Sequence, residues 1–372
     1  GVTIKEYDQV EETLAAIDCG VLVDESSCNT RVFEAINQVV KSEGVPIVCA
    51  LKSRKNEAEL EGTRRAHLRD GAAKTRFIAW LFEHMSQHEE SPLNEAEIAE
   101  RLHAFRAETA ELIGEGDTFC GDSFSAIVGS GGNGAIIHYH PEKATAKKLR
   151  RDELLLVDSG GQYVDGTTDV TRTFSFDGEA PALAKEAYTR VLMGHIDLAL
   201  AVFPEHFCPG PYLDVLARRP LWEVGLDYGH GTGHGVGAFL CVHEGPHGIT
   251  MTRRGKRLFE APMAQGMLVS NEPGYYDTEA GFGIRIENVV EVVAKETPHQ
   301  WRQRQSLGMR DLTLIPHQTE GLLDMSLLQT HHLRYLDSYH ARVFNELSPL
   351  LSKCNDQRAS RLLKKWTRPL LH

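Results

Sequence analysis

The chain lacks the long apolar runs of a membrane protein. No apolar stretch in its 372 residues approaches the roughly 20 that a membrane-spanning helix needs. The first residues show neither the basic segment nor the apolar segment of a signal peptide. We therefore predict that the membrane is not a partner.

The chain also lacks a basic cluster of the kind that grips phosphates. Its formal net charge is −12, which argues against a nucleic-acid partner. An apolar content of 41% and a charged content of 25% are ordinary for a globular protein. A length of 372 residues is sufficient for two or three domains.

Cysteine pairs with CxxC spacing are absent as well. Seven cysteines, an odd number, favour free thiols in a reducing compartment over a disulfide framework. We therefore expect a cytoplasmic protein. The sequence begins with Gly1 rather than methionine, so we expect a processed or trimmed fragment.

The first fifty residues alternate short helical and strand-like segments, which is typical of part of an α/β domain. Residues 10–17 have helical apolar spacing, whereas residues 19–27 and 44–53 are short apolar runs that predict strands. From Lys52 onward, a charged and helix-favouring stretch predicts one long amphipathic helix after a domain boundary.

A second helix is predicted to begin at Asn94, because Asn94 and Glu97 have the spacing of a capping box. The apolar face of this helix should be buried. The stripe consists of Ile98, Leu102, Phe105, Thr109 and Leu112.

The character of the sequence changes between Cys120 and Val293, where short β-like runs alternate with glycine-rich turns. Helices are predicted at residues 181–203 and 212–224, the latter interrupted by Pro220, and the tail from residue 316 to 372 reads as helical. Strands flanked by helices indicate an α+β domain with a curved antiparallel sheet.

Two aspartates in this region invite a chemical explanation. The apolar run at residues 154–157 leads directly into Asp158, and Asp169 follows eleven residues later. The dipeptide Asp165-Gly166 favours a hairpin turn, which would place both aspartates on neighbouring strands. Buried carboxylates are costly unless a metal, an arginine or solvent compensates them. The alternative interpretation is that Asp158 merely begins a loop.

Three histidines and two glutamates follow in similar segments. His230, His234 and His243 stand among glycines, which let the backbone come close to a ligand, although a glycine-rich surface loop is the alternative. Glu272 precedes a Pro-Gly turn, and Glu287 lies in a strand-like run where Arg285 could be its ion partner.

Together, these residues suggest a metal centre. Four carboxylates and one imidazole suit two divalent ions of the manganese, cobalt or zinc type better than a thiolate zinc site. The carboxylates would repel one another without cations. A water bridging two such ions would lose its proton near neutral pH and become a nucleophile. The predicted ligands are Asp158, Asp169, His234, Glu272 and Glu287.

These motifs resemble the pita-bread metallopeptidases, the family of methionine aminopeptidase, prolidase, aminopeptidase P and creatinase. The order of the ligands and the eleven-residue gap between the aspartates are those of the family. The segments GAIIHY, VDSGGQYVDGTTDVTRTF, GLDYGHGTGHGVGAFLCVHEGP, NEPGYY and GIRIENVV are similar in detail to the cytosolic, eukaryotic-type Xaa-Pro aminopeptidases. The similarity extends from about Lys52 to the C-terminus.

The resemblance implies a role for each matching position. Asp158 would hold one metal, Asp169 and Glu287 would bridge the pair, and His234 and Glu272 would bind the other ion. Glu272 would also act as general acid and base, and His243 would stabilise the oxyanion. His138, His230 and His243 would contact substrate, and Arg285 would orient Glu287 or a substrate carboxylate.

The resemblance also implies a fold, an activity and an assembly. Residues 1–51 would be the remnant of a creatinase-like N-terminal domain, 52–310 the pita-bread catalytic domain, and 311–372 a helical C-terminal extension. The expected activity is that of a dinuclear Xaa-Pro aminopeptidase that uses metal-activated hydroxide, with Mn²⁺ first and Zn²⁺ or Co²⁺ as alternatives. The expected substrates are peptides with proline second, and the expected assembly is a homodimer through the catalytic domain. The alternative functions are an Xaa-Pro dipeptidase and a non-catalytic peptide-binding module.

Overall fold

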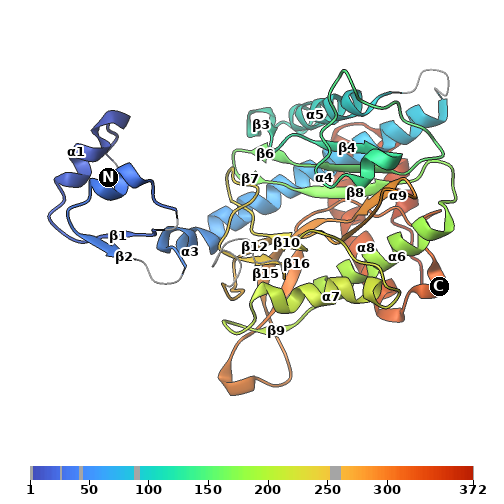
Figure 1. The fold of residues 1–372 in the computed structure, drawn as a ribbon. Helices are drawn as coiled ribbons and strands as arrows, with labels where there is room; N and C mark the ends of the chain where they lie inside the picture. The colour runs from blue at the N-terminus through green and yellow to red at the C-terminus, as the bar shows by residue number, and fades with distance from the viewer. Residues whose placement is uncertain (1–2, 26, 42–44, 88–92, 252–260, 372) are drawn as a thin grey trace.

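The computed structural model describes residues 3–25, 27–41, 45–87, 93–251 and 261–371. A small N-terminal unit stands apart from a larger α+β body, and the long helix α4 (Glu57–Gln87) runs from the junction into the body (Figure 1). Within the described residues, no helix is both long and apolar enough to cross a membrane.

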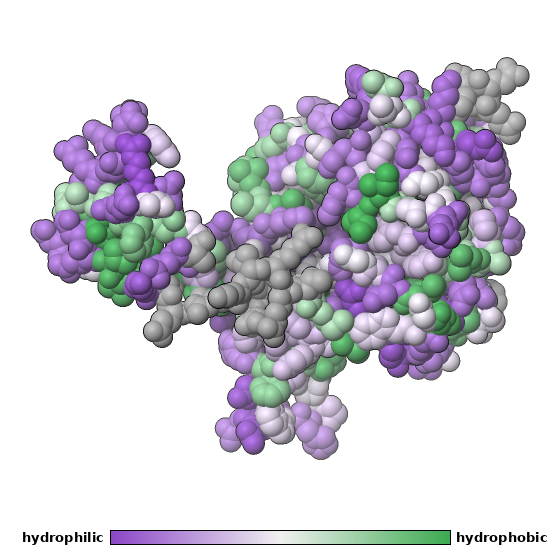
Figure 2. All heavy atoms as spheres, in the orientation of Figure 1, coloured by the Kyte–Doolittle hydropathy of each residue, from purple (hydrophilic) through white to green (hydrophobic). Residues whose placement is uncertain are grey.

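The N-terminal unit holds a two-stranded parallel sheet. Strand β1 (Val21–Val23) pairs with β2 (Val39–Lys41), and the short helices α1 (Val10–Ala15) and α2 (Thr30–Glu34) accompany them. Leu22 and Val40 are exposed, and Figure 2 shows apolar residues gathered on the surface of this unit. Of the described apolar residues of this unit, only Val23 and Ile36 are buried, so the unit buries little apolar surface by itself.

The strand predicted at residues 44–53 is wrong for the residues that the structure describes there. Helix α3 (Ile47–Ser53) begins directly after Pro46 and crosses the predicted domain limit at residue 51. Proline fits the start of a helix, and the following Ala50, Leu51 and Lys52 are good helix formers, so local propensity outweighed the apolar run.

Helices α4 and α5 (Glu95–Leu112) confirm the two predicted helices. Asn94 caps α5: its side chain accepts from the Glu97 N–H at 3.0 Å, and the Glu97 carboxylate accepts from the Asn94 N–H at 2.8 Å. The predicted stripe is buried except at Leu112, which is 49% exposed because it is the last residue of the helix.

The body contains antiparallel sheets only, among the strands that the structure describes. One sheet has the order β4-β5-β8 and a second has the order β12-β15-β16-β9. The strands of these two sheets are β4 (Ile127–Ser130), β5 (Leu155–Ser159), β8 (Val170–Phe174), β9 (Phe203–Pro204), β12 (Leu268–Asn271), β15 (Asn288–Lys295) and β16 (Ser306–Asp311). The smaller sheets contain β3 (Phe119–Asp122), β6 (Gly161–Tyr163), β7 (Gly166–Thr167), β10 (Gly233–His234), β11 (Gly248–Ile249), β13 (Gly274–Asp277) and β14 (Phe282–Arg285).

Within the part of the chain that the structure describes, four further α-helices cover the sheets. They are α6 (Ala182–Ala199), α7 (Gly210–Trp222), α8 (Thr330–Lys353) and α9 (Gln357–Trp366). Pro220 lies inside α7 without ending it, so the predicted interruption is wrong. One buried cluster joins α6 and α8 to β14, and another joins α4, α5 and Trp366 to β5 and β8. The prediction of helices around an antiparallel sheet is confirmed.

Polar contacts fasten α4 to its surroundings along its length. The Lys74 ammonium donates to the Ser159 hydroxyl at 2.6 Å, and the Arg106 guanidinium pairs with Asp70 at 2.7 Å. Further along, Arg76 pairs with Asp356 at 3.1 Å. All of these partners on α4 are buried, so α4 is tied to β5, to α5 and to the start of α9.

Candidate metal centre and peptide pocket

The two predicted aspartates lie on neighbouring strands. Asp158 lies in β5 and Asp169 directly precedes β8, and the antiparallel pairing sets Asp158 opposite Thr171. The chain reverses between them through the β6–β7 hairpin, in which Tyr163 pairs with Gly166. The hairpin was predicted correctly, although Gly166 belongs to the strand rather than to the turn.

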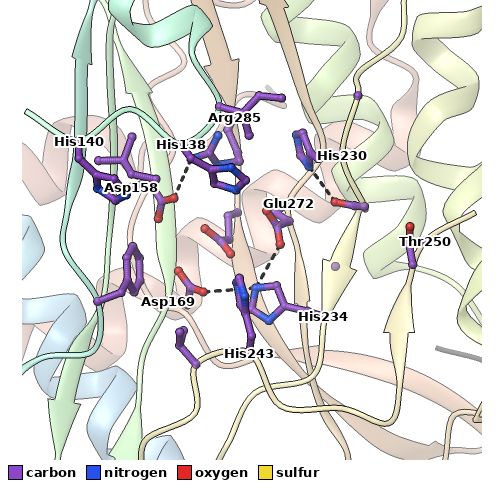
Figure 3. A pocket seen from close by; sticks show the side chains of 18 residues that line it. His138, His140, Asp158, Asp169, His230, His234, His243, Thr250, Glu272 and Arg285 are labelled. Atoms are coloured by element: carbon purple, nitrogen blue, oxygen red, sulfur yellow. Dashed lines mark hydrogen bonds and ion pairs between the residues drawn. The ribbon is translucent and has the colours of Figure 1, made fainter. Parts of the chain in front are cut away.

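The other predicted ligands come from three further segments. His234 ends β10, Glu272 follows β12, and Glu287 lies between β14 and β15. All five open into one pocket of about 390 Å³ (Figure 3). The polar side chains that line it are His138, His140, Asp158, Asp169, His230, His234, His243, Thr250, Glu272, Arg285 and Glu287.

The ligand atoms of this group are close to one another. His234 Nε2 lies 3.5 Å from Asp169 Oδ2 and 3.2 Å from Glu272 Oε1. Ligand atoms of Asp169, His234 and Glu287 all lie within 4.8 Å of one another. The structure thus brings a nitrogen and several carboxylate oxygens from distant parts of the chain to one point.

The electrostatics of the pocket call for positive charge. Burial raises the pKa of Asp169 to about 7, and burial with the nearby carboxylates Asp169 and Glu272 raises the pKa of Glu287 well above its usual range. Burial also raises the pKa of Glu272. Although burial opposes it, Asp169 and Glu272 raise the pKa of His234 to about 9. Without cations, protons must therefore offset the charge of these carboxylates.

A second observation also fits a cation. Asp158 Oδ1 is buried, and no hydrogen-bond donor reaches it among the described residues. A buried carboxylate oxygen without a donor is costly, and a divalent ion would satisfy it. The residues present therefore fit the implied pair of divalent cations.

Arg285 pairs with Asp158 rather than with Glu287, so the interpretation that it is the ion partner of Glu287 is wrong. Its Nη2 donates to Asp158 Oδ2 at 2.6 Å, and its Nε donates to Thr171 Oγ1 at 3.2 Å. The Thr171 hydroxyl in turn donates to Glu287 Oε2 at 2.7 Å. Arg285 thus reaches Glu287 only through a threonine.

His230 is held by protein contacts on both ring nitrogens. The Nδ1–H donates to the Gly231 carbonyl at 2.8 Å, and Nε2 accepts from the Tyr276 hydroxyl at 2.9 Å. The same hydroxyl accepts from Arg285 Nη1 at 2.7 Å. Burial and the charge of Arg285 lower the pKa of His230 to about 3, so the ring is neutral.

His243 lies against His234, with 3.9 Å between the ring centroids, and burial and that neighbour lower its pKa to about 4. The next residue, Glu244, fixes this loop. Its carboxylate accepts from Lys52 at 2.8 Å and from Lys55 at 2.9 Å. Lys52 belongs to α3, so the loop that carries His243 is tied to the junction with the N-terminal unit.

The apolar wall of the pocket was not predicted. The aromatic residues Phe239, Tyr275 and Tyr276, which stand in the same motifs as the ligands, do not line the pocket. Its apolar wall consists of Phe124, Ile127, Ile137 and Val242. His140 was missed as well, although the alternation in His138-Tyr139-His140 could have indicated that both histidines share a side.

A second group of possible metal ligands lies outside the pocket, where α6 meets α8. His331 and His332 contact Asp197 Oδ1 at 3.0 and 3.1 Å. The Gln329 N–H donates to His332 Nδ1, so His332 Nε2 carries the proton and donates to Asp197. A metal would displace that proton, so we interpret this group as a hydrogen-bonded link between helices.

Comparisons with known proteins agree with this geometry. A model of metallopeptidase family M24 matches residues 61–294, and a model of the C-terminal region of that family matches residues 305–370. The chain belongs to metallopeptidase family M24. The sequence-based identification of the pita-bread fold is thereby confirmed, with its α+β architecture.

Several relatives of this M24 chain carry the name aminopeptidase P. A probable Xaa-Pro aminopeptidase P of Laccaria bicolor is 43% identical over 98% of the chain and 55% of the relative. Aminopeptidase P2 of Arabidopsis thaliana is 50% identical over 82% of the chain and 41% of the relative. The chain thus spans about half the length of the curated relatives it matches.

Solved structures support the same M24 fold. The X-prolyl aminopeptidase of Caenorhabditis elegans, described as a cytosolic enzyme with a di-nuclear active site, matches with a TM-score of 0.87 and 33% identity. That match covers 98% of this chain and 57% of the other. A prolidase of Pyrococcus horikoshii matches with a TM-score of 0.63 and 22% identity over 84% of this chain and 79% of the other, which supports the fold alone.

Proposed function

We propose that this chain is the catalytic part of a dinuclear metal-dependent Xaa-Pro aminopeptidase. The observation that carries the proposal is the convergence of the five predicted ligands in one pocket beside an apolar wall. Asp158, Asp169, His234, Glu272 and Glu287 would hold the two cations. When bound, the ions would offset the carboxylate charges and supply an activated water as the nucleophile.

Glu272 is suited to move a proton during the reaction. Burial raises its pKa, and its Oε1 accepts from the Ser270 hydroxyl at 3.0 Å, which fixes the carboxylate. It would hold the proton released by the nucleophile and deliver it to the leaving amine. His243, a neutral ring beside His234, would donate to the developing oxyanion.

The pocket also suits a proline in the second position. An Xaa-Pro bond is a tertiary amide without an N–H, so the site needs no acceptor for that group. The wall of Phe124, Ile127, Ile137 and Val242 could pack the proline ring. His138 and His230 would contact the substrate around it, and Arg285 would orient Asp158 and, through Thr171, Glu287.

The finer parts of the proposal concern the metal, the location and the assembly. We propose Mn²⁺ as the native ion and a cytoplasmic location, which the cytosolic C. elegans relative supports. We propose a homodimer through the catalytic domain on the family resemblance. We also propose domain limits of 1–51, 52–310 and 311–372. Helix α3 spans the first limit, and the second limit falls at the end of β16.

The decisive experiment combines metal analysis with peptide cleavage. Protein purified without chelator and supplied with Mn²⁺ should bind two ions per chain, and Asp169→Asn should bind fewer. The wild type should cleave Xaa-Pro-Yaa but neither Xaa-Ala-Yaa nor Xaa-Pro. Preferential cleavage of Xaa-Pro would indicate the dipeptidase instead. Metal-loaded protein that cleaves no Xaa-Pro peptide would support the binding module.

A further inference from the structure

The segment between β4 and β5 carries two histidines into the pocket. Figure 3 shows His138 and His140 approaching from the side of Asp158, and both line the cavity. Tyr139, which lies between them, does not line the pocket. Its hydroxyl instead donates to the Glu95 carboxylate at 2.8 Å.

The Glu95 carboxylate accepts hydrogen bonds from residues along the whole of this segment. Its Oε1 accepts from the Ser130 N–H at 2.8 Å and from the Asn133 side chain at 3.0 Å. Its Oε2 accepts from the Tyr139 hydroxyl and from the Lys147 N–H, each at 2.8 Å. One carboxylate thus holds the start, the middle and the end of residues 130–147.

The environment of Glu95 makes its carboxylate the common acceptor of this segment. The side chain is fully buried, and no lysine or arginine of the described residues forms an ion pair with it. An apolar residue in its place would leave the Ser130 N–H, the Lys147 N–H and the two side-chain donors without this acceptor, which would cost free energy. What the carboxylate adds is a set of strong, directional hydrogen bonds at the first residue of α5, where the helix dipole favours an anion.

The segment is also fixed on its other side. It begins with the glycine-rich turn at residues 131–135, which packs directly against β14. A Cβ at Gly283 in β14 would lie 1.8 Å from the Gly134 carbonyl oxygen, so this approach needs a glycine. The segment is thus held between β14 and Glu95, and a shift of Tyr139 must move both neighbouring histidines.

We propose that Glu95 is a positioning residue that, through Tyr139, sets the placement of His138 and His140 for peptide binding. Glu95 does not touch the pocket and acts only through the segment. The inference rests on the proposed function, and it deepens that function by assigning a residue that determines how the substrate is held.

The test compares Tyr139→Phe and Glu95→Gln with a matched control in the metal-loaded protein. Tyr139→Phe should raise KM for an Xaa-Pro-Yaa tripeptide about tenfold, the effect of losing roughly one net hydrogen bond, with kcat within about twofold. Glu95→Gln should raise KM further, because its amide would face a donor. Both variants should keep the wild-type metal content.

The control is Tyr335→Phe. It also removes a hydrogen bond from a tyrosine to a carboxylate, here from Tyr335 to Asp311 at 2.8 Å, but on α8 rather than beside the pocket. This variant should leave KM unchanged. Hydrogen exchange across residues 130–147 should accelerate in Tyr139→Phe and not in the control.

The outcomes separate this inference from the proposed function. If the metal-loaded wild type cleaves no Xaa-Pro peptide, the proposed function fails, and Kd for the uncleaved tripeptide replaces KM. A wild-type KM or Kd in Tyr139→Phe would overturn the inference, whether or not exchange accelerates. If Glu95→Gln does not fold, Tyr139→Phe decides alone.

Discussion

Replacing Glu244 with glutamine should destabilise the protein far more than removing the exposed lysine that pairs with the same carboxylate. The two lysines on Glu244 differ in their environment. The Lys55 side chain is 1% exposed, whereas that of Lys52 is 54% exposed. Glu244→Gln therefore leaves one buried ammonium without its anion.

The expected magnitudes follow from this difference. Breaking a buried ion pair from one side costs about 3–5 kcal/mol, whereas an exposed pair contributes less than about 1 kcal/mol. For a chain of this size, the Glu244→Gln variant should melt about 4–6 °C below the wild type, and Lys52→Ala within about 1.5 °C of it. The double variant Lys55→Met with Glu244→Gln should recover much of the loss, because no buried charge remains.

The stability deficit of Glu244→Gln should depend on pH in a definite direction. Burial already lowers the pKa of Lys55, and without Glu244 the pKa should fall further. A lysine whose pKa is lower in the folded state than in the unfolded state destabilises the fold at low pH. Stability returns as the pH rises from the folded pKa toward the unfolded pKa. The deficit of Glu244→Gln should therefore shrink between pH 7 and pH 10, as measured by thermal unfolding followed by circular dichroism. Equal melting temperatures for Glu244→Gln and Lys52→Ala would refute the reasoning.

Three further predictions concern other parts of the body. Burial lowers the pKa of Lys74 to about 7, so above that pH the unfolded chain binds more protons than the folded one. The free energy of unfolding should therefore rise from pH 7 to pH 10. Lys74→Met should flatten this slope, as measured by urea titrations. Tyr276→Phe removes the hydroxyl shared by His230 and Arg285 and should lower kcat/KM about tenfold at unchanged metal content; a loss of metal would assign Tyr276 to the metal centre instead. Chelation should lower the melting temperature and Mn²⁺ should restore it, because ions that bind only the native state stabilise it; identical melting curves would contradict a metal site among these carboxylates.

Much of the site could be read from local patterns. The apolar run before Asp158 and the hairpin after it are short-range features, and they set Asp158 and Asp169 on adjacent strands. The Asn94–Glu97 capping box is equally local and predicted the start of α5. Spacing within about a dozen residues was sufficient for these parts.

Long-range partners could not be predicted in the same way. Arg285 seemed matched to Glu287, two residues away, but it pairs with Asp158, which is 127 residues distant in the sequence. The packing of β14 beside β8 and β5 decides that choice. Glu95 was likewise interpreted only as part of a helix, because its donors belong to a segment that begins 35 residues later. The strand prediction at residues 47–53 was wrong for a different reason, since an apolar run of that length suits a strand or a helix.

The single long helix α4 has a consequence for how this chain can vary. Its 31 residues present partners in a fixed angular order, so that Asp70 faces Arg106, Lys74 faces Ser159 and Arg76 faces Asp356. One residue inserted or deleted between them would rotate everything beyond it by about 100° and strip several buried charges of their partners at once. Natural variants should therefore carry substitutions in this helix but keep the number of its residues constant.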